Sequence, residues 1–337
     1  GDLGRDLTCS DTRSWCGPGM RAASSQPPPS SASSAKPKYI TAARRKRVLS
    51  ACVHSVATML LSSPLHEGER VAVMQIGAHL AWKNYNDLFR SSILKVLSRP
   101  GNGTDFLAVM VEPQPHVFER LRQGSKKFGA QVVVANAAVC AEGSGAATDF
   151  FIVDPSIGMT DGIDIRTGLR TARWTSQIAS IDRSQVVKHM PKSLRLAANY
   201  SEDDYIKRVR VPCHSVADLT SRHGIVSHRF ALLSIDAEGH DVRILRSTPL
   251  ETILPWIINW EKTFATGDEI CDLLEKLRRL GYSCECDTEN MHCYHSRVRD
   301  AQLNACGAIP EAYEFTCVRR NSVCSGRYPS PAFKGRE

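Results

Sequence analysis

Short runs of apolar, β-branched residues alternate with longer segments of helical periodicity from residue 67 onward. The first three runs cover Val71–Ile76, Phe106–Val111 and residues 131–134, and helical patterns follow at 86–98 and 115–128. Apolar runs of four to eight residues are typical of strands buried on both faces. Their alternation with helices predicts a parallel sheet covered by helices on both sides, so we assign the chain to the α/β fold class.

The second half of the chain continues this alternation and then closes the sheet. We expect a buried strand at residues 231–235 with a helix after it, a further strand at 256–260, and a helix at 268–280. Tyr282–Cys286 should form an antiparallel hairpin with residues 291–295 or with residues 313–319. We prefer the nearer partner because hairpin connections are short.

Composition divides the chain into three parts. Residues 1–41 contain the Pro- and Ser-rich stretch QPPPSSASSAKPK and predict a disordered basic tail or a targeting segment. Residues 42–297 would form the α/β domain, which opens with a helix at 42–61. Within it, the long polar segment 154–209 is a possible lid over a binding site. Residues 298–337 would be a cysteine-containing appendage.

The distribution of charge along the chain argues against a nucleic-acid partner. The net charge is +8, but residues 17–66 hold seven Lys or Arg and no acid, whereas residues 67–337 hold 34 basic and 32 acidic residues. The body therefore lacks the concentrated positive field that nucleic-acid binding requires, and we expect no nucleic-acid partner. No run of about eighteen apolar residues occurs, so we predict no transmembrane segment and a soluble body. An organelle transit route, if Met20 were the initiator, and a secretory route both stay open.

Small and polar residues gather where the first three predicted strands end. Gly77 and Ala78 follow the first strand, Glu112 the second, and Asn136 with Ala137 the third. Ligands of open α/β sheets bind at the carboxyl ends of the strands, so these residues predict a nucleoside-sized site. A carboxylate at the end of the second strand can accept hydrogen bonds from ribose hydroxyls. Taken singly, a turn glycine or an acid at a helix start explains each residue equally well.

Two acids follow the predicted strand at 231–235, in the segment FALLSIDAEGHDVRIL. With this segment, the chain resembles the FkbM-type S-adenosylmethionine-dependent methyltransferases, a branch of the class I methyltransferase fold. Five motifs carry the resemblance, in order: MQIGA (74–78), VEPQPHVFERL (111–121), NAAVC (136–140), SVADL (215–219) and SIDAEGHDVRIL (234–245). Together they span about residues 67–295.

The resemblance implies a Rossmann-like, seven-stranded, mostly parallel sheet and S-adenosyl-L-methionine as cofactor. The residues that it assigns to the cofactor lie at three strand ends: Gln75, Gly77, Ala78, Glu112, Asn136 and Ala137. Gly77 and Ala78 would lie under its methionine end, Glu112 would bind its ribose, and Asn136 and Ala137 would flank its adenine.

The acceptor implied by the resemblance is a hydroxyl on a sugar or another small molecule. Removal of the hydroxyl proton needs a base, for which Asp236 is the first candidate, with Glu238 orienting the acceptor and His240 in reserve. No metal is required by this chemistry. Alternatively, Asp236 or Glu238 caps the following helix, because acids are favoured near helix N-termini.

The first loop departs from the family pattern. Similar members usually continue with Asn, Asp and Gly after the Gly-Ala pair, whereas this chain has His79, Leu80 and Ala81. A degenerate, non-catalytic binding protein with the same fold is therefore the alternative function. A nicotinamide dehydrogenase ranks below both, because the full Gly-x-Gly-x-x-Gly turn is missing.

Twelve cysteines are many for a chain of 337 residues, and seven of them follow residue 270. They predict disulfides if the compartment is oxidising, and buried reduced thiols otherwise. The set Cys284, Cys286, Cys293 and His295 offers a weaker zinc interpretation, because Cys-x-Cys is not the usual ligand spacing. The sequons at Asn102 and Asn199 are compatible with a secretory route.

Overall fold

A computed structural model describes residues 54–60, 66–67, 69–79, 106–141, 147–155, 178–190, 192–196, 201–286 and 290–298, together with two short strands, Cys317–Val318 (β12) and Val323–Cys324 (β13). The predicted helix at 86–98 lies outside these residues, as do Leu80, Ala81 and the sequon asparagines Asn102 and Asn199. Of the helix predicted at 42–61, residues 54–60 are described and are helical.

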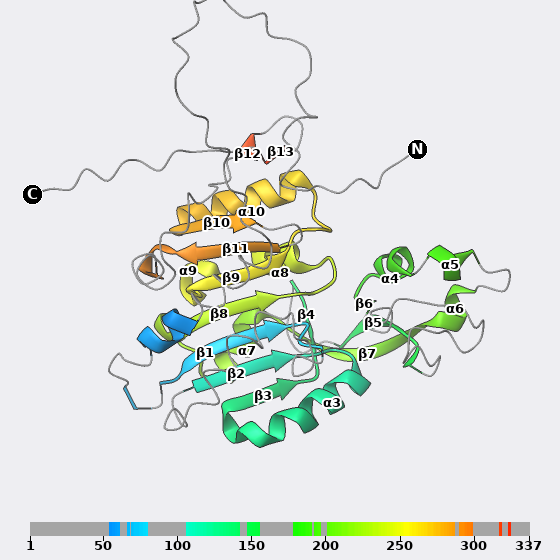
Figure 1. Ribbon diagram of the computed structural model, residues 1–337, viewed down its shortest axis with the longest axis horizontal. Helices are drawn as coiled ribbons and strands as arrows, with labels where there is room; N and C mark the ends of the chain where they lie inside the picture. The colour runs from blue at the N-terminus through cyan, green and yellow to red at the C-terminus, as the bar shows by residue number, and fades with distance from the viewer. Residues whose placement is uncertain are drawn as a thin grey trace, which may run out of the picture.

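A seven-stranded sheet forms the centre of the molecule, in the order β10-β11-β9-β8-β1-β2-β3 (Figure 1). Its strands are β1 (Val71–Ile76), β2 (Phe106–Val111), β3 (Val132–Ala135), β8 (Phe230–Ile235), β9 (Ile257–Glu261), β10 (Tyr282–Cys286) and β11 (Asn290–His295). Neighbours from β9 to β3 pair in parallel, and β11 runs antiparallel to both β9 and β10. The predicted mostly parallel sheet is confirmed, and so is the nearer hairpin partner of β10.

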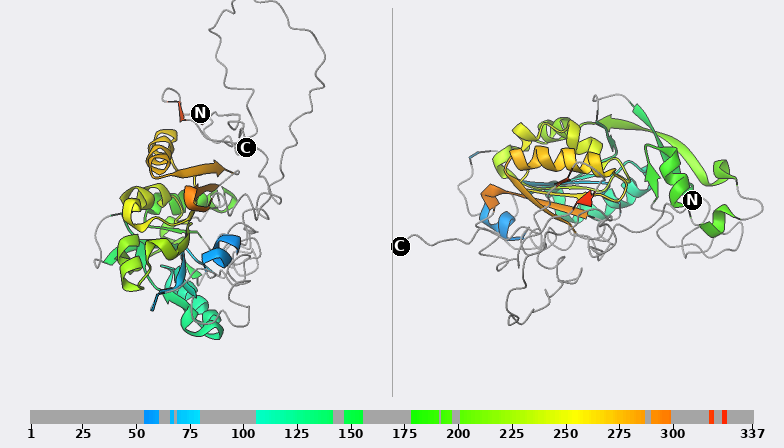
Figure 2. Two further views of the ribbon diagram at one scale, coloured as in Figure 1. Left: turned by 90° about the vertical axis from the view of Figure 1, so that its left-hand side faces the viewer. Right: turned by 90° about the horizontal axis from the view of Figure 1, so that it is seen from above.

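Helices cover both faces of this sheet because successive residues of each strand point to opposite sides. Ala72 and Met74 belong to one core cluster with α7 (Val216–Arg222), α8 (Asp241–Ser247) and α10 (Gly267–Arg279). Val71 and Val73 belong to another, with the helix at 54–60 and with Leu121 of α3 (Pro115–Ser125). Figure 2 shows the helix at 54–60, in blue, on the face opposite α8 and α10.

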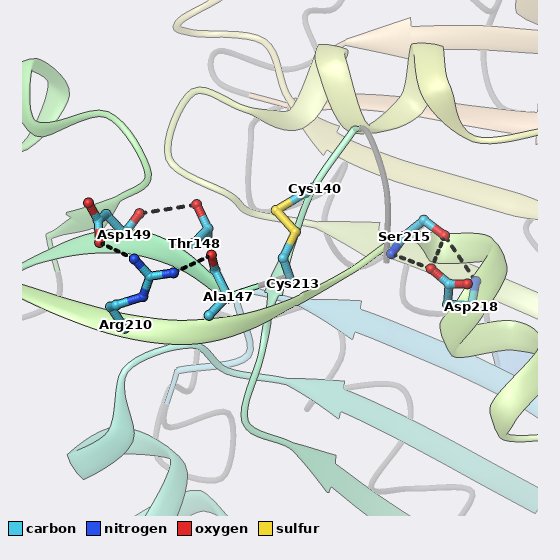
Figure 3. Close-up of a disulfide and its surroundings, with 8 residues drawn as sticks. All are labelled: Cys140, Ala147, Thr148, Asp149, Arg210, Cys213, Ser215 and Asp218. Atoms are coloured by element: carbon cyan, nitrogen blue, oxygen red, sulfur yellow. Dashed lines mark hydrogen bonds and ion pairs between the residues drawn. A yellow bond between two sulfur atoms is a disulfide. The ribbon is translucent and has the colours of Figure 1, made fainter. Parts of the chain in front are cut away.

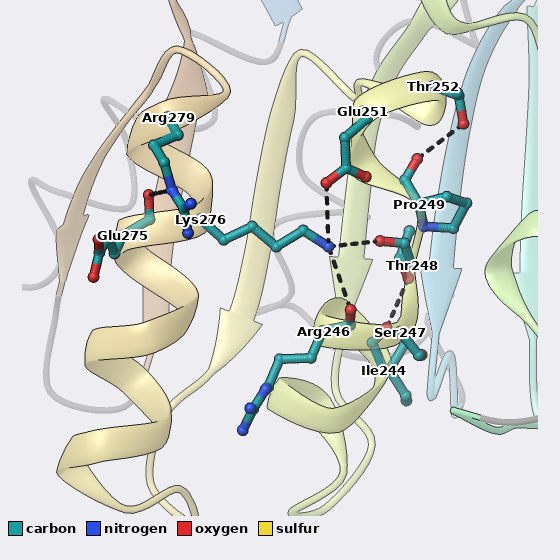
Figure 4. Close-up of polar contacts among 10 residues, drawn as sticks. All are labelled: Ile244, Arg246, Ser247, Thr248, Pro249, Glu251, Thr252, Glu275, Lys276 and Arg279. Atoms are coloured by element: carbon teal, nitrogen blue, oxygen red, sulfur yellow. Dashed lines mark hydrogen bonds and ion pairs between the residues drawn. The ribbon is translucent and has the colours of Figure 1, made fainter.

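Local signals set the ends of these helices. The α-helix predicted at 115–128 ends at Ser125 and continues as the 3-10 helix η1 (Lys126–Gln131), in which Gly129 has φ +57°. Helix α10 begins with a capping box, in which Thr266 and Glu269 bind each other's backbone amides. Lys276 of α10 donates to the carbonyls of Arg246 and Thr248 at the end of α8, at 3.3 and 3.1 Å (Figure 4). This contact ties the two helices together.

Shorter helical elements complete the described part of the chain. They are α4 (Arg183–His189), α5 (Lys192–Arg195), α6 (Glu202–Tyr205), η5 (Ser227–Arg229), α9 (Leu250–Ile253) and η6 (Ser296–Val298). None of the helices in the described ranges is long and apolar enough to span a bilayer.

A second sheet, which we call the inserted sheet, has the order β4-β7-β5-β6. Its strands are β4 (Ala138–Val139), β5 (Ala147–Val153), β6 (Ala179–Ser180) and β7 (Ile206–His214). Strand β5 pairs antiparallel with residues 206–212 of β7, and the two strands extend away from the main sheet, with α4 to α6 beyond them (Figure 1). Segment 154–209, which the sequence analysis gives as a possible lid, belongs largely to this part of the molecule. Its described residues supply β6, α4 to α6 and the start of β7.

Disulfides account for several cysteines. Cys140 and Cys213 join the end of β4 to β7 (Figure 3), and Cys284 and Cys293 join facing positions of β10 and β11. Cys271 is also disulfide-bonded. Because Cys284 and Cys293 bind each other, the zinc interpretation of that cluster is wrong, and no group suited to a metal occurs among the described residues.

Candidate active-site cleft

A cleft enclosing about 850 Å³ of space, part of it open to solvent, lies at the carboxyl ends of β1, β2 and β8. Four segments line it, each at the end of a strand. They are the end of β1 and its loop (Gln75, Ile76, Gly77, Ala78, His79), the loop after β2 (Glu112, Pro113, Gln114), the segment after β3 (Ala137, Ala138, Val139) and the loop after β8 (Asp236, Ala237, Glu238, His240). All of the sequence-predicted site residues except Asn136 therefore line one cleft. The inserted sheet adds Phe150, Ala179 and Ile181 as a further wall.

Glu112 is the buried carboxylate of this cleft, with 2% of its surface exposed. Its Oε2 accepts a hydrogen bond from the His79 amide at 2.7 Å, and its Oε1 accepts one from the Gln114 amide at 2.8 Å. These bonds fix the carboxylate between the loops that follow β1 and β2. Burial nevertheless raises the pKa of Glu112 to about 7, against the opposing effect of the two amides.

Gly77 allows the chain to turn where β1 ends. It has φ +73°, and a Cβ built there would lie 1.7 Å from the carbonyl oxygen of Asp236. The amides of Gly77 and Ala78 both donate to the Val111 carbonyl at 3.0 Å. A side chain at residue 77 would therefore push β8 away from β1 and widen the cleft.

His79, two residues after Gly77, also has a positive φ, of +41°. This lies in the left-handed region, which Asn and Gly adopt more readily than His. Burial lowers the pKa of its imidazole to about 4, with a smaller effect from Arg120, so His79 is neutral at pH 7. Its amide donates to Glu112, so the position of His79 itself is tied to the buried carboxylate.

Asn136 does not line the cleft. Its Nδ2 donates to the carbonyls of Glu112 and Pro113, at 2.9 and 3.1 Å. The side chain thus holds the backbone of the loop after β2, while its neighbour Ala137 lines the cleft. Sequence position predicted the strand end correctly but gave no information on the side chain's direction.

The loop after β8 presents two acids and one histidine to the cleft. Asp236 is exposed, whereas Glu238 is partly buried and has φ +48°. Burial raises the pKa of Glu238 to about 7, and the nearby Asp241 carboxylate adds to this shift. Burial lowers the pKa of His240, and Arg243 lowers it further. Of these groups, Glu238 has the pKa that suits proton uptake near neutral pH.

The capping alternative does not hold at the N-cap of α8. His240 occupies that position, and it makes no side-chain capping bond. The carboxylate that binds the loop amides is Asp241, only 1% exposed, which accepts from Ala237 N at 3.1 Å and from Glu261 N at 3.0 Å. Burial raises the pKa of Asp241 to about 6. Sequence reasoning missed this residue, although a third acid in IDAEGHD was the available signal.

The central sheet, its single reversed strand and a cleft at the carboxyl ends of the parallel strands together define the Rossmann-like class I methyltransferase fold. Residues 75–284, more than half of the chain, match the family described as the methyltransferase FkbM domain. The chain belongs to this family and is a methyltransferase. Members of the family generally use S-adenosylmethionine.

No curated protein matches the chain. Among solved structures, it is similar to the precorrin-6y C5,15-methyltransferase from Geobacter metallireducens GS-15, at 13% identity over 78% of this chain and 93% of that chain. The TM-score is 0.30, so this likeness carries no argument about fold or function.

Proposed function

We propose that this chain binds S-adenosylmethionine in the cleft and methylates a hydroxyl group of a sugar or another small molecule. The observation that carries the proposal is Glu112, a buried carboxylate at the end of the second strand, facing the cleft. The described residues form no ion pair with it, and a buried carboxylate without a cation is costly. Two ribose hydroxyls would supply the additional donors that stabilise its charged form.

The rest of the cleft fits the same cofactor. Gly77 and Ala78 leave the cleft floor without bulky side chains, and Ala137 does the same beside β3. Phe150 and Ile181 offer an apolar wall from the inserted sheet. When bound, the cofactor supplies an electrophilic methyl group. The protein's own residues then have to orient the acceptor and take up its proton.

We assign the base to Glu238, which lines the cleft and has a raised pKa, and keep Asp236 as its competitor. A base works best when its pKa is near the operating pH, and Glu238 has a pKa of about 7. Asp236, the first candidate from sequence, is exposed to solvent, and we assign it the orientation of the acceptor. His240 lines the same cleft within two residues of Glu238 and remains the reserve.

Calorimetric titration with S-adenosylhomocysteine tests the cofactor site. We expect micromolar affinity, roughly 8 kcal/mol, with NAD as a ligand that does not bind. Ribose hydroxyls prefer the ionised carboxylate, so affinity should rise about tenfold from pH 6 to pH 8 as Glu112 loses its proton. Glu112→Gln should bind about 10- to 100-fold more weakly and lose most of this pH dependence.

The same titration decides the alternative function. A folded protein that binds neither S-adenosylmethionine nor S-adenosylhomocysteine at either pH would be a non-catalytic member of the family. The strained His79 in the first loop is the observation that keeps this alternative open. Circular dichroism and a cooperative unfolding transition would establish that the titrated protein is folded.

A further inference from the structure

A buried hydroxyl joins the inserted sheet to the loop after β8. Ser180 Oγ, in β6, donates to the Glu238 carbonyl at 3.2 Å and accepts from the Asp182 amide at 3.2 Å. Because an amide only donates and a carbonyl only accepts, these partners fix the direction of both bonds. Ser180 is 1% exposed, so water does not compete for its hydroxyl. Ser180 and Glu238 lie 58 positions apart in the chain, so the contact depends on the tertiary fold.

The backbone of Glu238 needs such support. Its φ is +48°, in the left-handed region that a residue with a Cβ adopts only at a cost, and Gly239 follows with φ +96°. Because Gly239 has no Cβ, the peptide group between the two residues can rotate with little steric resistance. The bond from Ser180 to the Glu238 carbonyl opposes this rotation. It therefore restricts the backbone from which the Glu238 side chain enters the cleft.

The preceding part of the loop is held by the main sheet and α8 instead. Asp241, at the start of α8, accepts from the Ala237 amide at 3.1 Å and from the Glu261 amide, at the end of β9, at 3.0 Å. Glu238 thus lies between two anchors, one on each side along the chain. Asp241 belongs to the main domain, and Ser180 belongs to the insertion.

The Ser180 anchor has a defined position because its surroundings are ordered. Strand β6 pairs with β5, where Phe151 faces Ser180. Directly after β6, Asp182 caps α4 by accepting from the Ser184 amide at 2.8 Å. Helix α4 then packs through Val186 into a core cluster of the insertion. A strand pairing on one side and a helix start on the other therefore fix the hydroxyl.

Helix α4 also touches the next residue of the same loop. A Cβ built at Gly239 would lie 3.8 Å from the side chain of Gln185, in α4. The insertion therefore contacts consecutive residues of the loop after β8, Glu238 through β6 and Gly239 through α4. Its packing against this loop is a second observation, independent of the Ser180 hydrogen bond.

From these contacts we infer that Ser180 is a positioning residue for the reaction, which holds the backbone of Glu238 so that its carboxylate faces the cleft. The insertion would then contribute to proton removal as well as to the cleft wall. The role of Glu238 as base rests on the proposed function, whereas the hold of Ser180 on the loop does not. The two parts can therefore be tested separately.

The first test follows the Glu238 carboxyl by NMR in ligand-free protein that contains carboxyl-labelled glutamate. Glu238→Gln identifies its signal. In the wild type we expect a pKa of about 7. In Ser180→Ala the carboxyl should titrate about half a pH unit lower, because a loop released from the insertion exposes it to more water and burial is the main cause of its raised pKa.

Two further variants control this titration. Ser125→Ala is the matched control, because Ser125 is also buried and donates to a backbone carbonyl, that of Arg122 at 2.8 Å, but lies on α3 away from the cleft. Ser180→Thr keeps the hydroxyl. Both should titrate like the wild type, and circular dichroism should show that all variants are folded. Identical titration of Glu238 in the wild type and in Ser180→Ala would overturn the inference.

The second test measures catalysis with a double-mutant cycle. Radiolabelled methyl transfer from S-adenosylmethionine is measured with glucose, galactose, mannose and fucose as acceptor probes. Ser180→Ala should lower kcat about tenfold in the wild-type background but less than about twofold in Glu238→Gln, where no carboxylate is left to position. Binding of S-adenosylhomocysteine should not change. An equal loss of kcat in both backgrounds would indicate a merely structural role and overturn the inference.

Failure of the proposed function gives a different result. A wild-type protein that binds no S-adenosylhomocysteine and methylates none of these sugars would overturn the proposed function. The NMR titration needs neither cofactor nor acceptor, so it would then still decide whether Ser180 holds Glu238 in place.

Discussion

Gly77 connects the end of β1 to the loop that supports Glu112, and two separate constraints act on it. Its φ of +73° disfavours any residue with a Cβ, and the Asp236 carbonyl oxygen would lie 1.7 Å from such an atom. Gly224, which follows α7, shares the first constraint with φ +62°, but no atom lies within 4 Å of the position that its Cβ would take. Comparison of the two glycines therefore separates backbone strain from steric overlap.

We expect Gly224→Ala to lower the free energy of unfolding by about 1 kcal/mol, the usual cost of a left-handed alanine. Gly77→Ala should cost about 4 kcal/mol, because β1 and β8 must also move apart. Urea denaturation of both variants measures the difference. Equal losses would show that the loop after β8 yields easily and that Gly77 is not a steric requirement.

Replacement of the two acids after β8 tests the assignment of the base. Glu238→Gln should lower kcat by about 100- to 1000-fold and remove the inflection near pH 7 from its pH profile, because the raised pKa belongs to Glu238. Asp236→Asn should mainly raise the KM for the acceptor. Radiolabelled methyl transfer at several pH values gives both constants. An inflection that persists in Glu238→Gln but disappears in Asp236→Asn would reverse the two roles.

Individual residues of the site are predictable only as far as strand ends can be located. Glu112 and Gly77 follow apolar runs whose ends are clear, so the sequence predicts their place at the cleft. The direction of the Asn136 side chain and the burial of Asp241 depend on neighbours distant in sequence, such as the Glu261 amide. Local pattern carries no information about such contacts.

At the scale of elements, the disulfide between Cys140 and Cys213 holds the inserted sheet against the cleft. It closes a separation of 73 residues and reinforces a β4–β7 pairing of only two residue pairs, directly beside Ala138 and Val139 of the cleft wall. Beyond it, Ser215 and Asp218 form the capping box that starts α7 (Figure 3). The carboxyl end of β7 is thus held by its pairing and disulfide with the β4 segment, and the chain directly after it is held by the capping box of α7.

The double variant Cys140→Ser/Cys213→Ser should bind S-adenosylhomocysteine about tenfold more weakly, because the cleft wall becomes mobile, and should lose about 2–4 kcal/mol of stability. Cys284→Ser/Cys293→Ser is the control, since this pair joins β10 to β11 and does not line the cleft. It should be destabilised while binding the ligand normally. Equal binding by both double variants would refute a specific effect of Cys140–Cys213 on the cleft.

The elements of the main sheet are easier to predict than those of the insertion, for a physical reason. Strands β1, β2 and β8 are buried at every position, so they appear as uninterrupted apolar runs. Strand β7 has exposed Lys207, Arg208 and Arg210 and pairs with β5 at a distance of about sixty positions along the chain. Its strand character comes from this pairing, which the local sequence does not reveal.

For the whole molecule, buried acids make stability depend on pH in an unusual direction. Burial raises the pKa of Glu112 and Glu238 to about 7 and that of Asp241 to about 6, from ordinary values of 4.5, 4.5 and 3.8. Each carboxyl group therefore contributes most to the free energy of unfolding at low pH, where it is protonated in both the folded and the unfolded protein. This contribution is lost as pH rises through the pKa of the group in the folded protein. Buried histidines such as His79, with lowered pKa, act oppositely as pH falls.

A comparison with Glu112→Gln isolates one acid from this mixture, because glutamine does not ionise. The unfolding free energy of the wild type, minus that of the variant, should fall by about 3 kcal/mol between pH 4 and pH 8, at about 1.4 kcal/mol per pKa unit. Urea denaturation of the ligand-free proteins at five pH values measures it. A constant difference would mean that folding does not raise the pKa of Glu112.

The position of β11 in the sheet also affects how the molecule is made. Although β11 is the last of the seven strands along the chain, it lies between β9 and β10 rather than at the border of the sheet. While the ribosome is still producing residues 290–295, β9 has an open edge of unpaired amides and carbonyls, and β10 has no strand to join. The nascent chain therefore exposes an unpaired strand edge, which is prone to aggregation, until β11 inserts between β9 and β10. We expect the chain to depend most on chaperones before this insertion.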